Sequence, residues 1–249
     1  MQLQLIRNAT MRLTYGGRLL LTDPFLAAKH SLPSFAGISP NPLVDLPGPL
    51  EEIVAGVELL LVSHLHSDHF DAVAQARLSK DIPVLCQPGD EASIAKKGFH
   101  IVTPVIEPID WRGVVIRRTP GRHGRGEWVE RMGPVSGFVL QADQEPTVYW
   151  AGDTIWYEET ERLVAELQPE VIITHSSGAR FGEGEPIVMD GAQTIAVCQA
   201  APWARVVAIH LESLDHGRVS RPELRRLAEA AGIGPEQLLI PADGETLTF

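Results

Sequence analysis

The sequence contains 249 residues, of which 44% are hydrophobic and 21% are charged, and its formal net charge is −11. This composition is typical of a soluble globular protein with a sizeable core. The negative charge argues against a general nucleic-acid or anionic-membrane surface, and no apolar run approaches the roughly 20 residues of a membrane-spanning helix. We expect a cytoplasmic protein, because the N-terminus lacks signal-peptide features and Cys86 and Cys198 form no disulfide or CxxC pattern.

The first 22 residues alternate between apolar and polar side chains, which predicts short strands joined by a hairpin turn at Gly16-Gly17. The last strand ends at Asp23, followed by Pro24. Asp23 could cap a turn or orient a nearby metal-binding histidine. Residues 25–48 are rich in Pro, Gly and Ser without a clear period, so we expect a loop that walls the active site. A short helix at 50–55 follows.

The segment LLLVSHLHSDHFD, residues 59–71, has the clearest chemical signal in the chain. Its apolar run, 59–62, predicts a buried strand that ends where four polar side chains crowd together. These are His64, His66, Asp68 and His69. Packing does not explain three imidazoles and a carboxylate at this spacing, whereas zinc, iron, manganese or nickel would be bound by them.

Helical and strand patterns alternate through the next sixty residues. We expect helices at 70–78 and 89–96 and strands at 82–86, 101–106 and 114–118. Asp71 could cap the first of these helices or support the metal site. His123 lies in the Gly-rich segment RTPGRHGRG just after the last strand. Taken alone, it would be an ordinary loop histidine.

The second half of the chain shows three further strand ends with polar residues. Strands are expected at 135–141, 147–150, 171–174 and 204–209, and helices at 155–167, 190–200 and 221–231, with a short strand at 238–240. Asp153, in Ala-Gly-Asp-Thr, could be a helix cap or a functional carboxylate. His175 could contact substrate or make a structural hydrogen bond. His210 ends the 204–209 strand, and Glu212 and His216 follow as candidates for supporting or proton-carrying groups.

The HxHxDH motif after a buried strand, followed by His123, the Gly-Asp-Thr at Asp153 and then His210, resembles the signature of the metallo-β-lactamase-fold hydrolases. The resemblance covers essentially the whole chain. It implies an α/β (α+β) fold, a four-layer αββα sandwich of two mixed sheets with helices outside. We treat residues 1–249 as a single domain of two pseudo-symmetric halves, about 1–120 and 121–249.

The same resemblance implies a dinuclear metal site. His64, His66 and His123 would hold one ion, Asp68, His69 and His210 the other, and Asp153 would bridge them. Zinc is the first choice, with manganese, iron or nickel open. A hydroxide shared by the two ions would be the nucleophile. Asp68, Asp153 and His216 are the catalytic candidates, and supporting or substrate contacts are assigned to Asp23, Asp71, His175 and Glu212.

Within the family, the sequence is most similar to ascorbate-6-phosphate lactonase-like and N-acyl phosphatidylethanolamine phospholipase D-like proteins. This implies hydrolysis of a lactone, ester or phosphodiester bond in a small soluble metabolite. We expect no nucleic-acid partner and no stable membrane association, and the oligomeric state stays open. An iron-dependent redox enzyme on the same fold and a non-catalytic metal-binding module are the alternatives.

Overall fold

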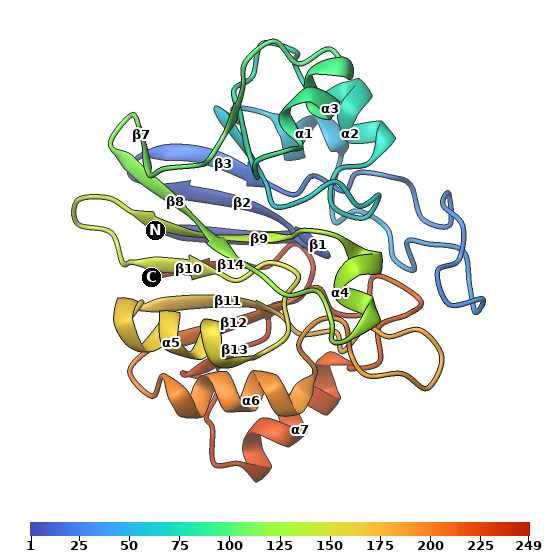
Figure 1. Ribbon diagram of the computed structural model, residues 1–249, viewed down its shortest axis with the longest axis vertical. Helices are drawn as coiled ribbons and strands as arrows, with labels where there is room; N and C mark the ends of the chain where they lie inside the picture. The colour runs from blue at the N-terminus through green and yellow to red at the C-terminus, as the bar shows by residue number, and fades with distance from the viewer.

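Two seven-stranded sheets lie face to face in the computed structural model, which describes residues 1–249. Helices α1 to α3 cover the outer side of one sheet, and α5 to α7 cover the outer side of the other (Figure 1). The predicted αββα sandwich is therefore confirmed. The helices are α1 (Leu50–Val54), α2 (Ala72–Arg77), α3 (Glu91–Lys96), α4 (Glu127–Met132), α5 (Glu158–Leu167), α6 (Gly191–Ala200) and α7 (Arg221–Ala230).

Each sheet is mixed, and both follow the same pairing scheme. The first sheet, in spatial order, contains β14 (Thr246–Thr248), β1 (Gln2–Arg7), β2 (Thr10–Tyr15), β3 (Arg18–Thr22), β4 (Leu59–Val62), β5 (Val84–Cys86) and β6 (Val102–Pro104). The second contains β7 (Ile109–Trp111), β8 (Val114–Pro120), β9 (Ser136–Gln141), β10 (Val148–Trp150), β11 (Val171–His175), β12 (Arg205–Ile209) and β13 (Leu238–Leu239).

The first three pairings in each sheet are antiparallel and the last three are parallel. The end of β3 in the first sheet therefore corresponds to the end of β10 in the second, and β4 corresponds to β11. The sheets do not coincide with the predicted halves of 1–120 and 121–249. Strand β7 pairs with β8, which pairs with β9 of the second half, and β14 returns to β1 beside the N-terminus.

Three apolar layers hold the sandwich together. Side chains from both sheets form the central layer, which includes Leu61 and Trp150. A second layer lies between the first sheet and its helices, and a third between the second sheet and α5 to α7. Strand β4 is buried on both faces, which explains its continuous apolar sequence. None of the helices combines the length and apolar composition that crossing a bilayer requires.

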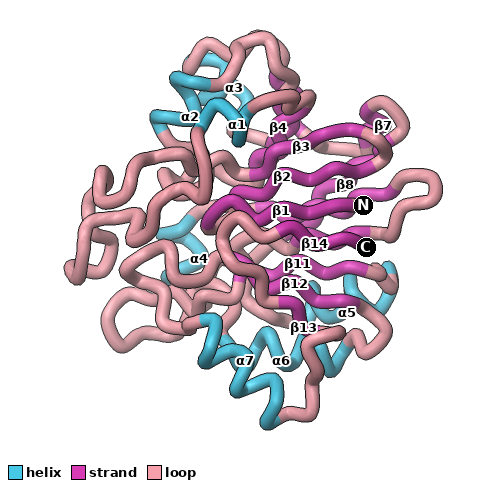
Figure 2. The backbone as a smooth tube through the Cα atoms, turned by 180° about the vertical axis from the view of Figure 1, so that it is seen from behind, coloured by secondary structure: helices cyan, strands magenta, loops and turns pink.

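Long loops gather at one edge of the molecule, away from the two chain termini (Figure 2). The parallel strands β4, β11 and β12 end on this side, as do β3 and β10. Because the carboxyl ends of neighbouring parallel strands meet at one sheet edge, polar residues that are distant in sequence come together there.

The structure differs from the sequence expectations in four places. Strand β14 was not predicted, because its three residues are too few to establish an alternating pattern. Helix α5 begins at Glu158 instead of residue 155, where the Thr160 hydroxyl accepts a hydrogen bond from the Tyr157 amide and donates one to the Tyr157 carbonyl. Helix α4 was not predicted, because it has six residues and none of them is buried. Strand β7 was also missed, because three residues are too few to establish an alternating pattern.

Candidate metal centre

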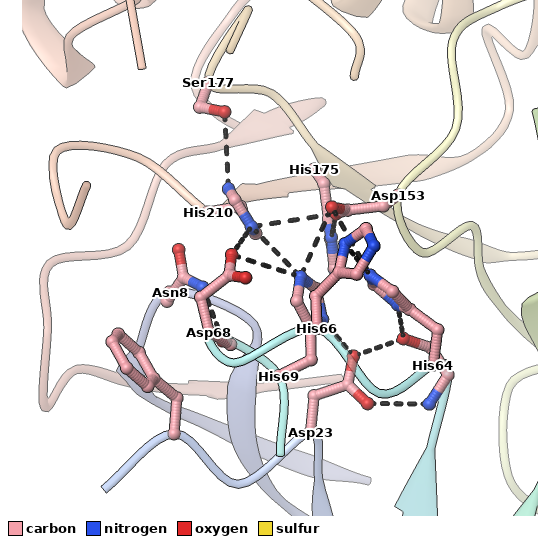
Figure 3. Close-up of polar contacts among 12 residues, drawn as sticks. Asn8, Asp23, His64, His66, Asp68, His69, Asp153, His175, Ser177 and His210 are labelled. Carbon is pink, nitrogen blue, oxygen red and sulfur yellow. Dashed lines mark hydrogen bonds and ion pairs between the residues drawn. The ribbon is translucent and has the colours of Figure 1, made fainter. Parts of the chain in front are cut away.

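Histidine and aspartate side chains from both sheets meet at the loop-bearing edge (Figure 3). The segment after β4 contributes four of them, and the loops after β8, β10 and β12 contribute His123, Asp153 and His210. All are nearly or fully buried except His66, which is partly exposed. The structure thus brings together all seven residues that the resemblance assigned to metal binding.

The first group consists of His64, His66 and His123, whose nearest ligand atoms lie within 4.8 Å of one another. Nε2 of His64 lies 2.9 Å from Nδ1 of His66. These three rings are held by two sheets, because His123 follows β8 whereas the other two follow β4. One cation could contact all three.

The second group surrounds Asp68. Its Oδ2 atom lies 3.5 Å from Nε2 of His69 and 3.5 Å from Nε2 of His210. The two imidazole nitrogens are 3.4 Å apart. His210 adopts a left-handed backbone conformation, with φ at 64°, and its amide donates to the Asn8 carbonyl. A non-glycine residue held in this conformation is typical of functional sites.

Asp153 lies between the two groups. Its Oδ2 atom is 3.3 Å from Nε2 of both His69 and His123, while Oδ1 is 3.7 Å from Nε2 of His210. The preceding Gly152 has φ at 69°, and a Cβ there would lie 2.5 Å from the Ser136 carbonyl oxygen. Only glycine fits this turn, which explains the Gly before the Asp in Ala-Gly-Asp-Thr.

The five imidazoles share one arrangement, in which one ring nitrogen bonds to a protein oxygen and the other faces the cluster. The outward partners are Ser63 Oγ for His64 (2.9 Å), Met132 O for His66 (3.0 Å), Asp23 Oδ2 for His69 (2.7 Å), Ile187 O for His123 (2.8 Å) and Ser177 Oγ for His210 (3.3 Å). Carbonyl and carboxylate oxygens only accept hydrogen bonds. When neutral, the rings that contact them donate outward and present an unprotonated nitrogen inward, and on His69 a cation would take the place that a proton otherwise occupies.

Unprotonated nitrogens and carboxylates that face one another at these distances repel unless a cation separates them. Histidine ligands in metal sites typically donate their outer N–H to a carboxylate or carbonyl, as these rings do. The donor set therefore fits metal, and the chemistry of imidazole and carboxylate suits zinc and its neighbours.

Burial and the neighbouring charged groups shift the pKa values of the cluster residues. Burial and the neighbouring imidazoles hold the pKa of His64 well below its usual range, and burial lowers the pKa of His123 to about 4. Burial also disfavours charge on His69, yet Asp153, Asp68 and Asp23 raise its pKa well above its usual range. In Asp153, the burial effect is outweighed by His69 and His210, which lower the pKa. Near neutral pH Asp153 is therefore ionised.

Asp23 supports the cluster from behind. Its carboxylate is fully buried and accepts hydrogen bonds from the Ser63 amide and hydroxyl as well as from His69 Nδ1. The structure thus places Asp23 in the supporting position that the resemblance implied. Ser63, whose hydroxyl also contacts His64, was not singled out from the sequence, where a serine after a strand carries no distinct signal.

Three predicted residues lie outside the cluster. Asp71 caps α2 by accepting from the Ala74 amide, and its other contact is the Ala27 amide, so it acts as a helix cap. Glu212 pairs with Arg221. His216 lies beside the cluster, between the rings of Phe35 and Phe181. Asp71 and Glu212 make no hydrogen bond to a residue of the cluster, so no contact supports the role predicted for them.

His175 makes one hydrogen bond to the cluster, and its ring stacks on that of His210 with centroids 5.0 Å apart. It is fully buried at the end of β11, and its Nδ1 lies 2.5 Å from Oδ1 of Asp153. Its Nε2 lies 2.9 Å from Nε1 of Trp150, a core residue of β10. This pairing could not be predicted, because the two residues are on different strands and tryptophan usually indicates core packing.

Comparison with known proteins shows the family to which this chain belongs. Residues 18–211 match the model of the beta-lactamase superfamily domain. The UPF0173 protein YddR of Bacillus subtilis is 34% identical, with 100% of both chains covered. A UPF0173 metal-dependent hydrolase of Xanthobacter autotrophicus is 26% identical, covering 95% of this chain and 93% of its own.

Two solved structures are similar over the full length. A possible metal-dependent hydrolase from Veillonella parvula is 32% identical, with a TM-score of 0.96 and coverage of 100% and 99%. An isothiocyanate hydrolase from Delia radicum gut bacteria is 34% identical, with a TM-score of 0.92 and the same coverage. This chain therefore belongs to the UPF0173 metal-dependent hydrolases of the beta-lactamase superfamily.

Proposed function

We propose that this protein is a dinuclear metal-dependent hydrolase of a small uncharged electrophile, with an isothiocyanate as the first candidate substrate and a lactone or ester as the second. The observation that carries this proposal is a cavity of about 200 Å³ directly beside the cluster. Its residues are Phe35, His66, Ser67, Asp68, His123, Met132, Asp153, Phe181, Ile187 and His216.

The cavity has a polar floor and an apolar wall. The floor is formed by cluster residues, whereas the wall comes from Phe35, Met132, Phe181 and Ile187. Phe181 stacks on Trp128, with ring centroids 5.1 Å apart, which stiffens this wall. A substrate of matching shape would place a small apolar group against the wall and its reactive centre over the floor.

The residues around the cavity argue against a phosphodiester, one of the three substrate bonds expected from the sequence. No lysine or arginine lines it. Proteins that recognise phosphate groups typically do so with arginine or lysine side chains or with helix N-termini. We therefore place lactones and esters ahead of phosphodiesters.

We consider an isothiocyanate as substrate because the isothiocyanate hydrolase from Delia radicum gut bacteria is 34% identical to this chain over the full length. An isothiocyanate is small and uncharged, and its central carbon is electrophilic. Addition of water forms a bond from oxygen to that carbon and moves a proton to nitrogen. The remaining proton of the added water then moves to nitrogen as the carbon–nitrogen bond breaks, which gives an amine and carbonyl sulfide, so that one water is consumed.

We assign the residues of this chain to metal binding and to proton transfer. His64, His66 and His123 would hold one divalent ion, Asp68, His69 and His210 a second, and Asp153 would contact both. When bound, these ions would lower the pKa of water and neutralise charge that develops on the substrate. We assign proton transfer to His216, because it lines the cavity and burial lowers its pKa, which keeps the ring neutral near pH 7. The neutral ring can accept the proton that the attacking water loses and then donate it to the leaving nitrogen or oxygen.

Metal analysis of the purified protein, followed by a substrate panel, tests this proposal. Isothiocyanates, lactones, carboxylic esters and phosphodiesters would be compared by kcat/KM in protein loaded with zinc, manganese or iron. We expect two ions per chain, the highest kcat/KM for an isothiocyanate and the lowest for a phosphodiester. A protein that holds two ions yet hydrolyses none of the panel would refute the proposal, and oxygen-dependent turnover with iron would favour the redox alternative.

A variant of the wall links the activity to this cavity. Phe35→Ala removes an aromatic wall residue, so kcat/KM for an apolar substrate should fall about 10-fold, with metal content unchanged. Phe249→Ala, which removes an aromatic ring stacked on Arg205 at the C-terminus, is the matched control and should leave kcat/KM unchanged. Equal effects of the two substitutions would argue against the cavity as the substrate site.

A further inference from the structure

We infer that His175 is a positioning residue for Asp153 and not a metal ligand, and that the indole N–H of Trp150 fixes this role by selecting the His175 tautomer. This inference deepens the proposed dinuclear site and rests on it. His175 is the one histidine for which the geometry offers two roles. Its ligand atom lies within 4.8 Å of those of His69, Asp153 and His210, so proximity alone would include it in a metal site.

The hydrogen-bonding capacity of tryptophan decides between the two roles. The indole Nε1–H can only donate, so Nε2 of His175, 2.9 Å away, must be the acceptor and carries no proton. A neutral imidazole then has its proton on Nδ1. This proton points at Oδ1 of Asp153, 2.5 Å away. Both nitrogens of His175 are therefore occupied, and neither has a lone pair available for a cation.

A protonated His175 is excluded by the same contact, because it would bring two N–H groups together. Trp150 cannot turn away, since it is only 1% exposed and stacks on Phe138 with ring centroids 5.8 Å apart in the layer between the sheets. The tautomer of His175 is thus fixed by the packed core and not by the solvent.

The consequence for Asp153 is a fixed carboxylate orientation. With Oδ1 engaged by His175, Oδ2 remains directed at the two histidines that belong to different groups, His69 and His123, each 3.3 Å away. We therefore assign Oδ2 as the oxygen that would serve both ions.

Metal affinity and the tautomer test this inference together. In protein loaded with zinc alone, long-range ¹H–¹⁵N NMR should show His175 protonated at Nδ1 only. Trp150→Phe retains the aromatic packing but removes the N–H, so this signature should be lost and zinc affinity, measured by chelator competition, should fall about 10-fold. Tyr149→Phe is the matched control, because it removes a buried hydroxyl from the neighbouring residue of the same strand, in the layer between the second sheet and α5 to α7.

Two substitutions of His175 distinguish positioning from ligation. His175→Phe removes the donor to Asp153 and should weaken zinc binding by up to about 100-fold. His175→Asn can place an amide N–H near the former Nδ1 position, so it should restore most of the affinity. If His175 were a ligand, His175→Asn would lose as much affinity as His175→Phe and Trp150→Phe would lose none, and the inference would be overturned.

The outcome is separable from that of the proposed reaction. Zinc affinity and the NMR signature need no substrate, so they can support the positioning role even if every compound in the panel fails. Conversely, hydrolysis of an isothiocyanate by a Trp150→Phe protein with unchanged zinc affinity would support the reaction and overturn the role of Trp150.

Discussion

The ends of β3 and β10 occupy corresponding places in the two sheets, and a buried aspartate follows each of them, yet the two carboxylates have different surroundings. Asp153, after β10, lies among the imidazoles of both groups. Asp23, after β3, lies behind them and reaches the cluster only through His69 Nδ1 and the hydroxyl of Ser63.

The next strand in each sheet shows the opposite assignment. His64, after β4, faces the cluster, whereas His175, at the end of β11, lies behind Asp153. At the first sheet the carboxylate of Asp23 supports an imidazole, that of His69, whereas at the second sheet the imidazole of His175 supports the carboxylate of Asp153. The residue type at a strand end therefore does not set its role. The role depends on which partner the neighbouring strand places behind it.

The same substitution at the two aspartates should separate these roles, and the larger effect is expected at Asp153. Asp153→Asn removes the negative charge that faces both groups while keeping the side-chain shape. We expect metal affinity to fall more than about 100-fold, beyond the range for supporting residues, and hydrolysis to be lost with the metal. Metal content after dialysis and kcat/KM at saturating metal would measure both. A variant with wild-type metal content and rate would contradict a direct role for Asp153.

Asp23→Asn should have the second-largest effect. It weakens the acceptor for His69 Nδ1 and leaves every inward-facing atom in place, so metal affinity should fall about 10- to 100-fold. Activity should return when metal is supplied in excess, unlike that of Asp153→Asn. The control is Asp71→Asn, a buried aspartate that also accepts backbone amides but contacts no cluster histidine. Equal losses at positions 23 and 71 would indicate general destabilisation.

Much of this arrangement could be predicted from the sequence, for a physical reason. A metal site needs particular side chains at strand ends, and HxHxDH and Gly-Asp-Thr show both the residue types and the strand ends in a single short segment. The contacts that orient the cluster residues from the side of the protein core could not be predicted. That His175 meets Trp150, or that Ser177 lies beside His210, depends on strand order and on pairings between residues more than twenty positions apart. Neither leaves a local pattern.

The wall of the cavity was the least predictable part. Residues 25–48 were expected to form a wall, and Phe35 of this segment does line the cavity. How the wall is held could not be foreseen, because residues 34–41 contain no helix and no strand of the two sheets. One carboxylate, that of Asp215, holds them instead. It accepts hydrogen bonds from the amides of Phe35 and Ala36 and from the side chain of Asn41, and it also contacts the Ser34 hydroxyl.

Asp215 thus extends the comparison to a carboxylate that contacts neither group of the cluster, and its removal should have the smallest effect. Asp215→Asn keeps one acceptor oxygen but places an amide against several donors. We expect metal affinity to be unchanged and KM for an apolar substrate to rise a few-fold, because Phe35 is no longer held against His216. The free energy of unfolding should fall by about 1–3 kcal/mol at pH 7. A loss of metal comparable to that of Asp23→Asn would contradict this separation between the wall and the floor.

The pH dependence of this loss gives an independent check. Burial alone would raise the pKa of Asp215, but the hydrogen bonds from Ser34, Asn41 and the backbone lower it below its usual range. The unfolded carboxyl titrates near pH 3.9, so between that value and the lower folded pKa the unfolded state binds more protons. The stabilisation is therefore complete above about pH 4 and declines as the pH falls further. Unfolding of both proteins in metal-free form should show a constant difference at pH 5 to 7 that narrows below pH 4, whereas a difference independent of pH would mean that the charge of Asp215 does not hold the wall.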